Sequence, residues 1–316
     1  MSVDLVNLCA AVVVFSLLMY ILLDGADLGV GMLFLLFPDQ EERRRLVASI
    51  LPVWDANETW LVLFAGGLLA LFPAAYSLMF TGLYLPLFIM LLALFARAVA
   101  LQYRSHASSR FRFMQDAIFI LSSLLAAFFQ GVMAGVVIDG LLPNGPLAWI
   151  APFPLICGGA VVASYLLLGC GWIRWRLRGD VGQRASRFAL LFLGLTIAAF
   201  VALGCLHPAY PVMAWQYAGG KMLLLASLAL CIAVALLLFS QRLMLPLIAA
   251  LLLVTCLLGV LVAAIYPWLI PNVITLQQAS ASPATQSFIL IGIAIVMPLT
   301  LIYNSWSFWV FRGKVE

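Results

Sequence analysis

Long apolar stretches follow one another along almost the whole chain, separated by short polar connections. Most of them exceed the ~18 residues that a helix needs to cross the hydrocarbon core of a membrane. None shows the alternating ~10-residue segments of a transmembrane barrel. The pattern predicts an all-α integral membrane protein with about nine transmembrane helices in a single polytopic domain, residues 1–316. The predicted spans cover residues 5–37, 53–75, 77–101, 113–137, 150–173, 187–206, 219–240, 243–266 and 286–311.

Two segments depart from a simple pattern of helix and short connection. The first span, 5–37, would be ~50 Å long as a helix, well beyond a hydrocarbon core of ~30 Å. We therefore expect it either to tilt and project into the cytoplasm or to bend at its glycines. The connection 267–286 is unusually long and polar, and it is interpreted either as a docking surface or as a plain connector.

The composition narrows the class of protein further. Hydrophobic residues make up 66% of the chain and charged residues only 9%. A soluble domain could not keep so much apolar surface from water, so membrane lipids are the expected surroundings. The net charge of +4 is gathered in short connections, which argues against a nucleic-acid partner. The N-terminus lacks the basic stretch of a signal peptide, so we expect the first helix to be retained.

The basic residues lie almost entirely on alternate connections. Of the sixteen Lys and Arg residues, only Lys221 lies in an even-numbered connection. By the positive-inside rule, the N-terminus is predicted to be periplasmic and the C-terminus cytoplasmic. The other fifteen are Arg43, Arg44, Arg45, Arg97, Arg104, Arg110, Arg112, Arg174, Arg176, Arg178, Arg184, Arg187, Arg242, Arg312 and Lys314.

The cysteines and histidines do not indicate a metal site. All six cysteines lie in apolar runs or at their edges, without a Cys-x-x-Cys motif, which favours a packing role. A membrane haem held by two imidazoles needs histidines well inside the helices. His106 lies in a basic connection and His207 at a helix end. We therefore do not expect this chain to hold a metal or a haem by itself.

Two aspartates, Asp24 and Asp27, lie inside the first predicted span, where an ionised side chain is costly. They are three residues apart, so both side chains project from one face of a helix. Gly25 and Gly29 would let a second helix approach closely and shield this face from lipid. Two interpretations stay open. The aspartates either join helices by hydrogen bonds, or their mutual repulsion makes one of them hold an exchangeable proton.

A second acidic pair, Asp55 and Glu58, opens the second predicted span. Its spacing is typical of a capping box, which is one interpretation. The other is a polar entrance that continues the track of the first acidic pair. Arg97 is either the counter-charge of these carboxylates or a side chain that snorkels to the headgroups. Asp116 is interpreted as favouring the N-terminus of the fourth helix.

Short stretches of the chain match motifs of one protein family. They are Asp24-Gly-Ala-Asp-Leu-Gly-Val-Gly-Met32, Trp54-Asp-Ala-Asn-Glu-Thr-Trp-Leu61, Ala65-Gly-Gly67, Leu94-Phe-Ala-Arg97, Tyr103-Arg-Ser105 and Tyr266-Pro-Trp-Leu-Ile-Pro271. At these residues the chain resembles subunit II of the cytochrome bd-type quinol oxidases, including their cyanide-insensitive branch. The resemblance implies two four-helix bundles plus one peripheral helix. It also implies a respiratory complex in the bacterial cytoplasmic membrane that oxidises quinol and reduces dioxygen to water.

The resemblance also implies which parts of the chemistry lie outside this chain. The haems, b and d or b only, would be in the partner, subunit I, and no catalytic residue would be in this chain. A bound structural quinone and small single-helix accessory subunits are both compatible with the sequence. Carried over residue by residue, Asp24, Asp27 and Asp55 would line a proton route from the cytoplasm towards the haems of the partner. Glu58 stands where the family commonly has Gln, and Trp60 would lie beside a hydrophobic passage for oxygen.

We therefore predict a non-haem subunit II of a bd-type quinol oxidase, which supports assembly and supplies protons through Asp24, Asp27, Asp55 and Glu58. Two alternatives stay open. A proton-coupled secondary transporter could use the same intramembrane carboxylates, although no clear inverted repeat is visible. A purely structural scaffold would leave these carboxylates inert.

Overall fold

The computed structural model describes residues 3–104, 108–141, 147, 149–177, 179–311 and 313. Ser105, His106, Arg178, Arg312 and Lys314 lie outside these ranges, so their part in the charge pattern and motifs is not described.

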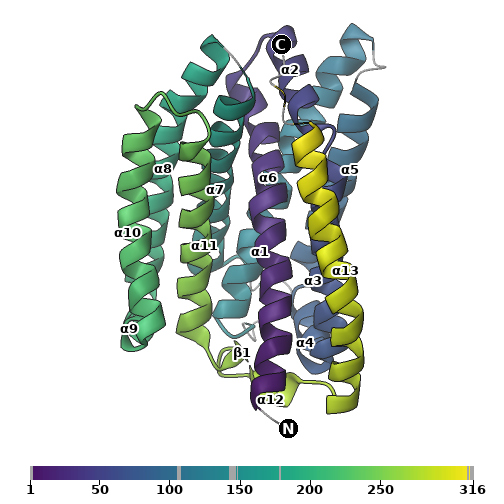
Figure 1. Ribbon diagram of the computed structural model, residues 1–316, viewed down its shortest axis with the longest axis vertical. Helices are drawn as coiled ribbons and strands as arrows, with labels where there is room; N and C mark the ends of the chain where they lie inside the picture. Colours follow the sequence, from purple (N-terminus) through teal and green to yellow (C-terminus); the bar gives the residue numbers. More distant parts are fainter. Residues whose placement is uncertain are drawn as a thin grey trace.

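The described residues form a nearly all-helical chain (Figure 1). Eight of the described helices are long and apolar enough to cross a membrane, and a ninth span is counted if the bent pair α3 and α4 is one span. This agrees with the predicted architecture of about nine helices. The eight are α1 Val3–Leu33 with the short continuation η1 Phe34–Leu36, α5 Tyr84–Tyr103, α6 Ser109–Ile138, α7 Pro152–Arg176, α8 Asp180–Leu206, α10 Ala218–Leu238, α11 Leu245–Ile265 and α13 Pro283–Val310.

Helix α1 runs unbroken through Gly25, Gly29 and Gly31. Of the two expectations for this long span, a bend at the glycines is therefore wrong. The helix stands near the centre of the molecule, and its last turns reach the end of the bundle that carries α2 (Figure 1). We call this the α2 end, and the opposite end the N-terminal end.

The connection between the first two predicted spans holds a helix that the apolar pattern did not predict, α2 Gln40–Ile50. Asp39 caps it by accepting a hydrogen bond from the Glu42 backbone N–H at 3.0 Å. Leu46 and Ile50 are buried, whereas the charged residues of α2 lie mostly on its other faces. The search for long apolar runs did not detect α2 because only one face of this helix is apolar.

The second predicted span is broken. Helix α3 Trp54–Leu71 is followed by α4 Pro73–Gly82, which is bent by 119° from it. Pro73 lacks a backbone N–H and disfavours a helical backbone at the preceding residue. Phe72 accordingly leaves the helix, with φ −135° and ψ 59°, and Pro73 begins the new helix. The predicted boundary near residue 75 is therefore shifted.

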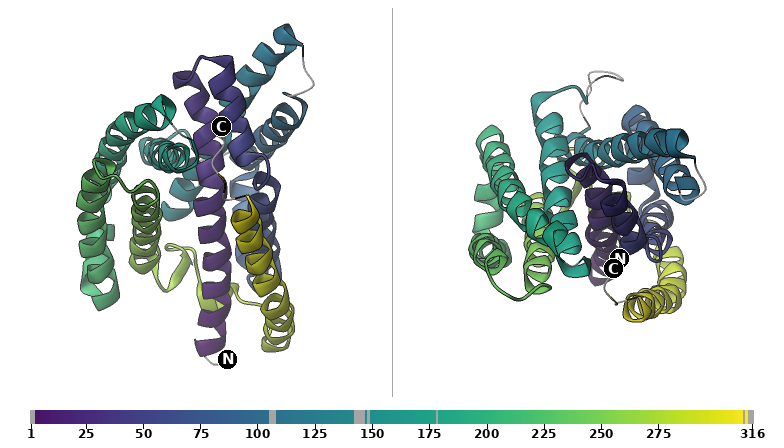
Figure 2. Two further views of the ribbon diagram at one scale, coloured as in Figure 1. Left: turned by 45° about the horizontal axis from the view of Figure 1, so that its top comes forward. Right: turned by 90° about the horizontal axis from the view of Figure 1, so that it is seen from above.

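The helices sort into two groups of four with α13 at the edge (Figure 2). Helix α1 packs against α3 and α6, and α5 packs against α6. In the second group, α7 packs against α8 and α11, and α10 packs against α8 and α11. Contacts of α7 with α1 and α6 join the two groups, whereas α13 contacts α3 and α1. This is the predicted arrangement of two four-helix bundles plus one peripheral helix.

The long connection before α13 forms a folded cap at the N-terminal end (Figure 1). Strands β1 Trp268–Ile270 and β2 Ile274–Thr275 pair antiparallel, and the short helix α12 Leu276–Ala279 follows. The side chains of Ile270 and Ala279 are fully buried beside residues of α1, α3 and α4. The remaining short helix, α9 Ala209–Gln216, connects α8 to α10 at the same end. The connection is therefore folded and packed onto the bundle, and its use as a docking surface stays a prediction.

Two glycine seams bring the helices of the two groups together. A Cβ added to Gly29 would lie 2.0 Å from the backbone oxygen of Tyr165, so α7 can pack here only against a glycine. A Cβ added to Gly131 would lie 2.4 Å from the backbone oxygen of Cys157, so α6 and α7 show the same close approach. The approach of a second helix to the glycine face of α1, predicted from its spacing, is confirmed.

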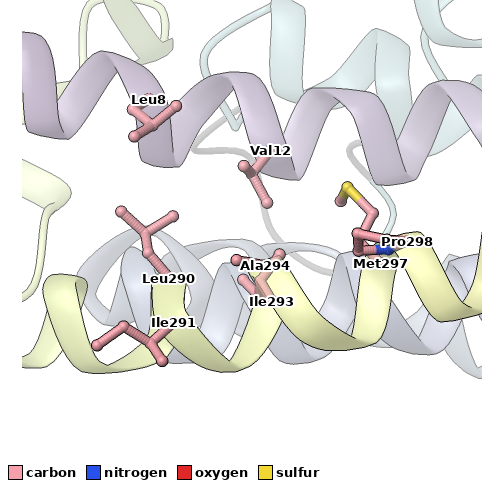
Figure 3. A pocket seen from close by; sticks show the side chains of 8 residues that line it. All are labelled: Leu8, Val12, Leu290, Ile291, Ile293, Ala294, Met297 and Pro298. Atoms are coloured by element: carbon pink, nitrogen blue, oxygen red, sulfur yellow. The ribbon is translucent and has the colours of Figure 1, made fainter.

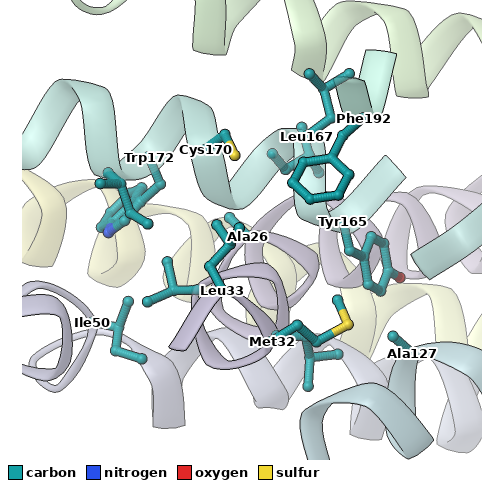
Figure 4. Close-up of a cluster of buried hydrophobic side chains, with 14 of the residues drawn as sticks. Ala26, Met32, Leu33, Ile50, Ala127, Tyr165, Leu167, Cys170, Trp172 and Phe192 are labelled. Atoms are coloured by element: carbon teal, nitrogen blue, oxygen red, sulfur yellow. The ribbon is translucent and has the colours of Figure 1, made fainter. Parts of the chain in front are cut away.

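The main apolar core lies between these helices (Figure 4). Leu33 from α1, Ile50 from α2 and Trp172 from α7 are buried in it. The Trp172 indole N–H donates to Ser49 Oγ at 3.2 Å, so the buried polar edge of this ring is satisfied. The core thus fixes α1 and α7 side by side and positions the polar residues on α1.

Candidate functional site

Arg97 of α5 lies between two carboxylates from other helices. Its Nη1 is 2.7 Å from Asp24 Oδ1 on α1, and its Nη2 donates to Glu58 Oε1 on α3. The side chains of Arg97 and Asp24 are 1% and 0% exposed, whereas that of Glu58 is 27% exposed. A buried guanidinium is tolerated only when it is paired and hydrogen-bonded. The snorkelling interpretation of Arg97 is therefore wrong, and its charge joins three helices.

Asp27 lies next to this ion pair on α1 and has a different partner. The Asn57 side-chain amide donates from Nδ2 to Asp27 Oδ2 at 2.7 Å. Asp27 is 2% exposed and Asn57 1% exposed, so this contact is shielded from lipid. The two aspartates of α1 are thus held by different helices, Asp24 by α5 and Asp27 by α3. We call Asp24, Asp27, Asn57, Glu58 and Arg97 the inner cluster.

A chain of hydrogen bonds connects the inner cluster to α6 and α7. The Tyr165 hydroxyl donates to Gln130 Oε1 at 2.7 Å, and Gln130 Nε2 donates to the Tyr20 oxygen at 2.7 Å. Tyr20 lies one helical turn before Asp24, and its hydroxyl interacts with the Asp24 carboxyl group. Each donor in this chain therefore points towards Asp24.

The structure places the other predicted site residues around the inner cluster. Asp55 is exposed in the first turn of α3, where it lies on the same face as Glu58. Val53 is the N-terminal cap of α3 and no side chain caps the helix, so the capping-box interpretation is wrong. Trp60 is fully buried, with its ring 5.8 Å from that of Phe15 in an edge-to-face contact.

An apolar groove lies between α1 and α13, towards the N-terminal end (Figure 3). Its volume is about 390 Å³, and Leu8 and Val12 of α1 face Leu290 and Ile293 of α13 across it. A groove of this kind accepts apolar material such as acyl chains, and it brings no charged group to the site.

A second charged cluster lies closer to the α2 end. Asp116 of α6 accepts from Arg104 Nε at 2.5 Å and from Arg43 Nη1 at 3.0 Å, and Gln40 Nε2 also donates to it at 3.1 Å. Arg43 also donates to the backbone oxygens of Phe34 and Phe37, at the end of the first span. The interpretation of Asp116 as a helix-terminus charge is wrong, because it joins α2, α5 and α6. We call Gln40, Arg43, Arg104 and Asp116 the end cluster.

Two titratable groups outside the spans, Glu41 and Tyr210, have shifted pKa values. Glu41 and Arg44 form an exposed ion pair on α2, with Nη2 2.6 Å from Oε1. The hydrogen bond from Arg44 holds the pKa of Glu41 below its ordinary value. At the N-terminal end, the Tyr210 hydroxyl donates to the Ile138 backbone oxygen at 2.7 Å. Burial, with the nearby Asp139 charge, raises the pKa of Tyr210.

The described residues contain no group of three or more His, Cys, Asp and Glu side chains that could hold a metal ion. His207 is 33% exposed, and its Nε2 is 3.6 Å from Asp139 Oδ1. This position at the end of α8 does not fit an axial ligand of a membrane haem, which has to be buried between helices.

Sequence reasoning missed the roles of Tyr20, Gln130 and Tyr165, and it included Asn57 only within a family motif. One signal was available, because Tyr20 precedes Asp24 by four residues and therefore shares its helix face. Gln130 is a single amide in an apolar run, and no spacing connects it to the distant Tyr20.

Comparisons with known proteins agree with this architecture. The family model described as cytochrome bd terminal oxidase subunit II matches residues 5–311. The cytochrome bd ubiquinol oxidase subunit 2 of Bacillus subtilis (strain 168) is 28% identical over 319 residues, which cover 94% of this chain and 93% of that protein. The cytochrome bd-I ubiquinol oxidase subunit 2 of Escherichia coli (strain K12) is 30% identical over 194 residues, which cover 57% of this chain and 51% of that protein.

Among solved structures, the bd oxidase from Geobacillus thermodenitrificans has a similar fold, with a TM-score of 0.82, 18% sequence identity and coverage of 97% of both chains. The family model extends from the first turn of α1 to the end of α13 and includes every residue of the inner cluster. The chain is therefore a multi-pass membrane protein that belongs to the cytochrome bd terminal oxidase subunit II family.

Proposed function

We propose that this chain is the non-haem subunit of a quinol oxidase complex in the bacterial cytoplasmic membrane, and that its inner cluster passes protons from the cytoplasm towards the oxygen-reducing partner. Membership of the subunit II family supports the oxidase assignment and does not support the secondary transporter. The observation that carries the proton role is the inner cluster. Two of its carboxylates contact one arginine and a third accepts from Asn57 beside them, between helices that are otherwise apolar.

The proton role follows from the balance of the reaction. Reduction of one dioxygen to two water molecules takes up four electrons and four protons, and oxidation of two quinols releases the same numbers. If the released protons leave on the outer side while the consumed protons come from the cytoplasm, the reaction charges the membrane without a pump. The consumed protons then need a path of titratable or hydrated groups through the inner half of the membrane, because bare hydrocarbon does not carry them.

The placement of the carboxylates suits such a path. Asp55 is exposed and Glu58 is partly exposed, one turn apart on α3, so both are accessible for proton exchange. Asp24 and Asp27 are fully shielded and follow on α1. We assign the entrance to Asp55 and Glu58 and the buried section to Asp24 and Asp27. Under the proposed topology, with the N-terminus periplasmic, the α2 end faces the cytoplasm and the entrance lies towards that side.

The cofactors of the complex are assigned to the partner. Bound haem would supply the electron transfer and oxygen chemistry, and the partly exposed His207 at the end of α8 does not fit an axial ligand of a membrane haem. We place haems b and d, or b only, in the haem-bearing subunit I, with quinol as the substrate of the complex. A structural quinone, small single-helix subunits and lipids are further components that this assignment accommodates.

The oxygen passage is proposed on separate grounds. The fully buried Trp60 and the half-buried Phe15 form an aromatic pair between α1 and α3. Dioxygen is apolar, so a path beside these rings would exclude water and ions while admitting the gas. We assign Trp60 to the wall of such a path.

The proposal is tested with the purified complex, in which this chain is co-expressed with its haem-bearing partner. We expect Asp27→Asn and Asp55→Asn to slow quinol-driven oxygen uptake at least tenfold at unchanged haem content, because each removes a titratable group. Glu41→Gln, an exposed carboxylate outside the inner cluster, is the matched control and should leave uptake unchanged. Full turnover in both aspartate variants would remove the proton role. Loss of haem at normal chain levels would assign these residues to assembly instead.

A further inference from the structure

The surroundings of the Asn57 amide differ from those of the other polar groups in the inner cluster. Asn57 Nδ2 donates to Asp27 Oδ2, but Asn57 Oδ1 is buried and accepts no hydrogen bond from a described residue. An ionised carboxylate has acceptors only, so it can satisfy the N–H of the amide but leaves the amide oxygen unpaired. A neutral carboxyl group adds an O–H donor, which can pair with that oxygen. The same reasoning holds if the amide nitrogen and oxygen are exchanged.

Asp24 has the opposite surroundings. One of its oxygens accepts from Arg97 at 2.7 Å. The other oxygen, Oδ2, is buried and has no donor within strict hydrogen-bonding geometry among the described residues. The Tyr20 hydroxyl interacts with this carboxyl group, and since its oxygen accepts from Gln130, its own proton is free to be donated. The contact with the charged Arg97 guanidinium, with the Tyr20 hydroxyl nearby, suits an ionised carboxylate at Asp24.

The number of charges in the inner cluster also favours a neutral Asp27 beside an ionised Asp24. Arg97 contacts Asp24 and Glu58, so one positive charge already faces two carboxylates. An ionised Asp27, one helical turn from Asp24, would add a further negative charge to a group that lipid and apolar helices surround. A proton on Asp27 avoids this charge.

Resting on the proposed proton function, we propose that Asp27 is the proton carrier of the inner cluster and is held at rest as a neutral carboxyl group paired with the Asn57 amide. Asp24 is then a permanently ionised anchor, positioned by Arg97 and by the chain Tyr165–Gln130–Tyr20. In each transfer the Asp27 O–H bond breaks, the proton leaves towards the partner, and the carboxylate that remains takes up a proton from the entrance at Glu58 and Asp55. Asn57 is a positioning residue, because it orients the carboxyl group that exchanges the proton.

The test is infrared spectroscopy of the purified complex in H2O and in D2O, where a neutral carboxyl group gives a carbonyl stretching band that shifts on deuteration. We expect Asp27→Asn to abolish one such band and Asp24→Asn to retain it. Asn57→Leu should shift the band to higher frequency, because the carbonyl loses its hydrogen-bond donor and the O–H its acceptor. Glu41→Gln is the matched control and should leave the band unchanged.

Persistence of all carboxyl bands in Asp27→Asn, loss of the band in Asp24→Asn, or an unchanged frequency in Asn57→Leu would each overturn the assignment. If Asp27→Asn does not assemble, the Asn57→Leu spectrum decides alone. Oxygen uptake separates this inference from the function on which it rests. A band that is lost in Asp27→Asn with full uptake supports the protonated pair and removes the proton-supply role. Impaired uptake with the band retained does the reverse.

Discussion

The inner cluster and the end cluster each have a buried charged centre, but they hold opposite excesses of charge. In the inner cluster one arginine, Arg97, contacts two carboxylates and a third lies beside them. In the end cluster one carboxylate, Asp116, contacts two arginines. The carboxylates of the two clusters also differ in how many hydrogen bonds they accept from side chains. Asp116 accepts from Arg43, Arg104 and Gln40, whereas Asp27 accepts from Asn57 alone among the described residues.

This difference indicates which cluster can exchange protons. A carboxylate with several strong donors is stabilised as an ion and releases nothing, so the end cluster is suited to fasten α2 onto α5 and α6. An excess of carboxylates over cations cannot stay fully ionised in a water-excluded site. The inner cluster is therefore suited to hold a proton and to give it up.

The largest effect is expected from removal of Arg97. Arg97→Met leaves the Asp24 carboxylate buried without its cation, and loss of one partner of a buried ion pair typically costs ~3–5 kcal/mol. We expect a large fall in the unfolding midpoint of the purified complex and a loss of assembled complex. Arg97→Lys, the control, keeps the charge but cannot donate to two carboxylates as a fork, so it should lie between the variant and the wild type. A wild-type midpoint in Arg97→Met would contradict the paired geometry.

A smaller effect is expected when the end cluster is changed. Asp116→Asn removes the negative charge, but Arg43 keeps its bonds to the backbone of the first span and Arg104 keeps Gln40. We expect a loss of ~1–3 kcal/mol in the free energy of unfolding, measured by denaturation in detergent. Oxygen uptake per haem should stay at the wild-type level in the molecules that remain folded. A slowed uptake at normal stability would show that the end cluster takes part in proton transfer, and the comparison would fail.

The sequence predicted the fold wherever long apolar runs define it. It did not predict α2, because the single apolar face of this helix lies between charged residues. It also did not predict the break at Phe72, although Pro73 indicated a helix boundary there. It also left the segment after α11 open, because short strands and a four-residue helix carry little periodicity. These elements depend on packing against the bundle, which local patterns do not describe.

The candidate site was predicted in part for a similar reason. Buried carboxylates are rare enough in a membrane span to be recognised singly, and a nearby arginine suggests a partner. Asn57 and Gln130 are neutral amides, and their importance comes from the residues they meet across helices. The bond between Gln130 and Tyr20 joins residues that are 110 positions apart, so the sequence alone gave no reason to pair them.

Glu58 offers a milder change within the inner cluster. Glu58→Gln leaves Arg97 paired with Asp24, and the amide oxygen can still accept a bond from the guanidinium. Because the Glu58 side chain is partly exposed, we expect a loss of about 1 kcal/mol or less in unfolding free energy. Oxygen uptake should slow as in Asp55→Asn, because both residues belong to the proposed proton entrance. A collapse of stability like that of Arg97→Met would mean that Glu58, rather than Asp24, is the main partner of Arg97.

The smallest effect is expected at Glu41 and Arg44, an exposed pair on the same helix as two members of the end cluster. Arg44 lowers the pKa of Glu41, so the pair stabilises the folded state at pH values above the pKa of Glu41 in the unfolded chain. This contribution is lost as the pH falls through the lower folded-state pKa. Glu41→Gln should remove that pH dependence, and at neutral pH the unfolding midpoint should hardly change, because solvent and salt screen exposed pairs. The variant therefore separates burial from charge pairing as the cause of the larger effects above. A loss as large as that of Asp116→Asn would show that pairing itself, wherever it occurs, stabilises this protein.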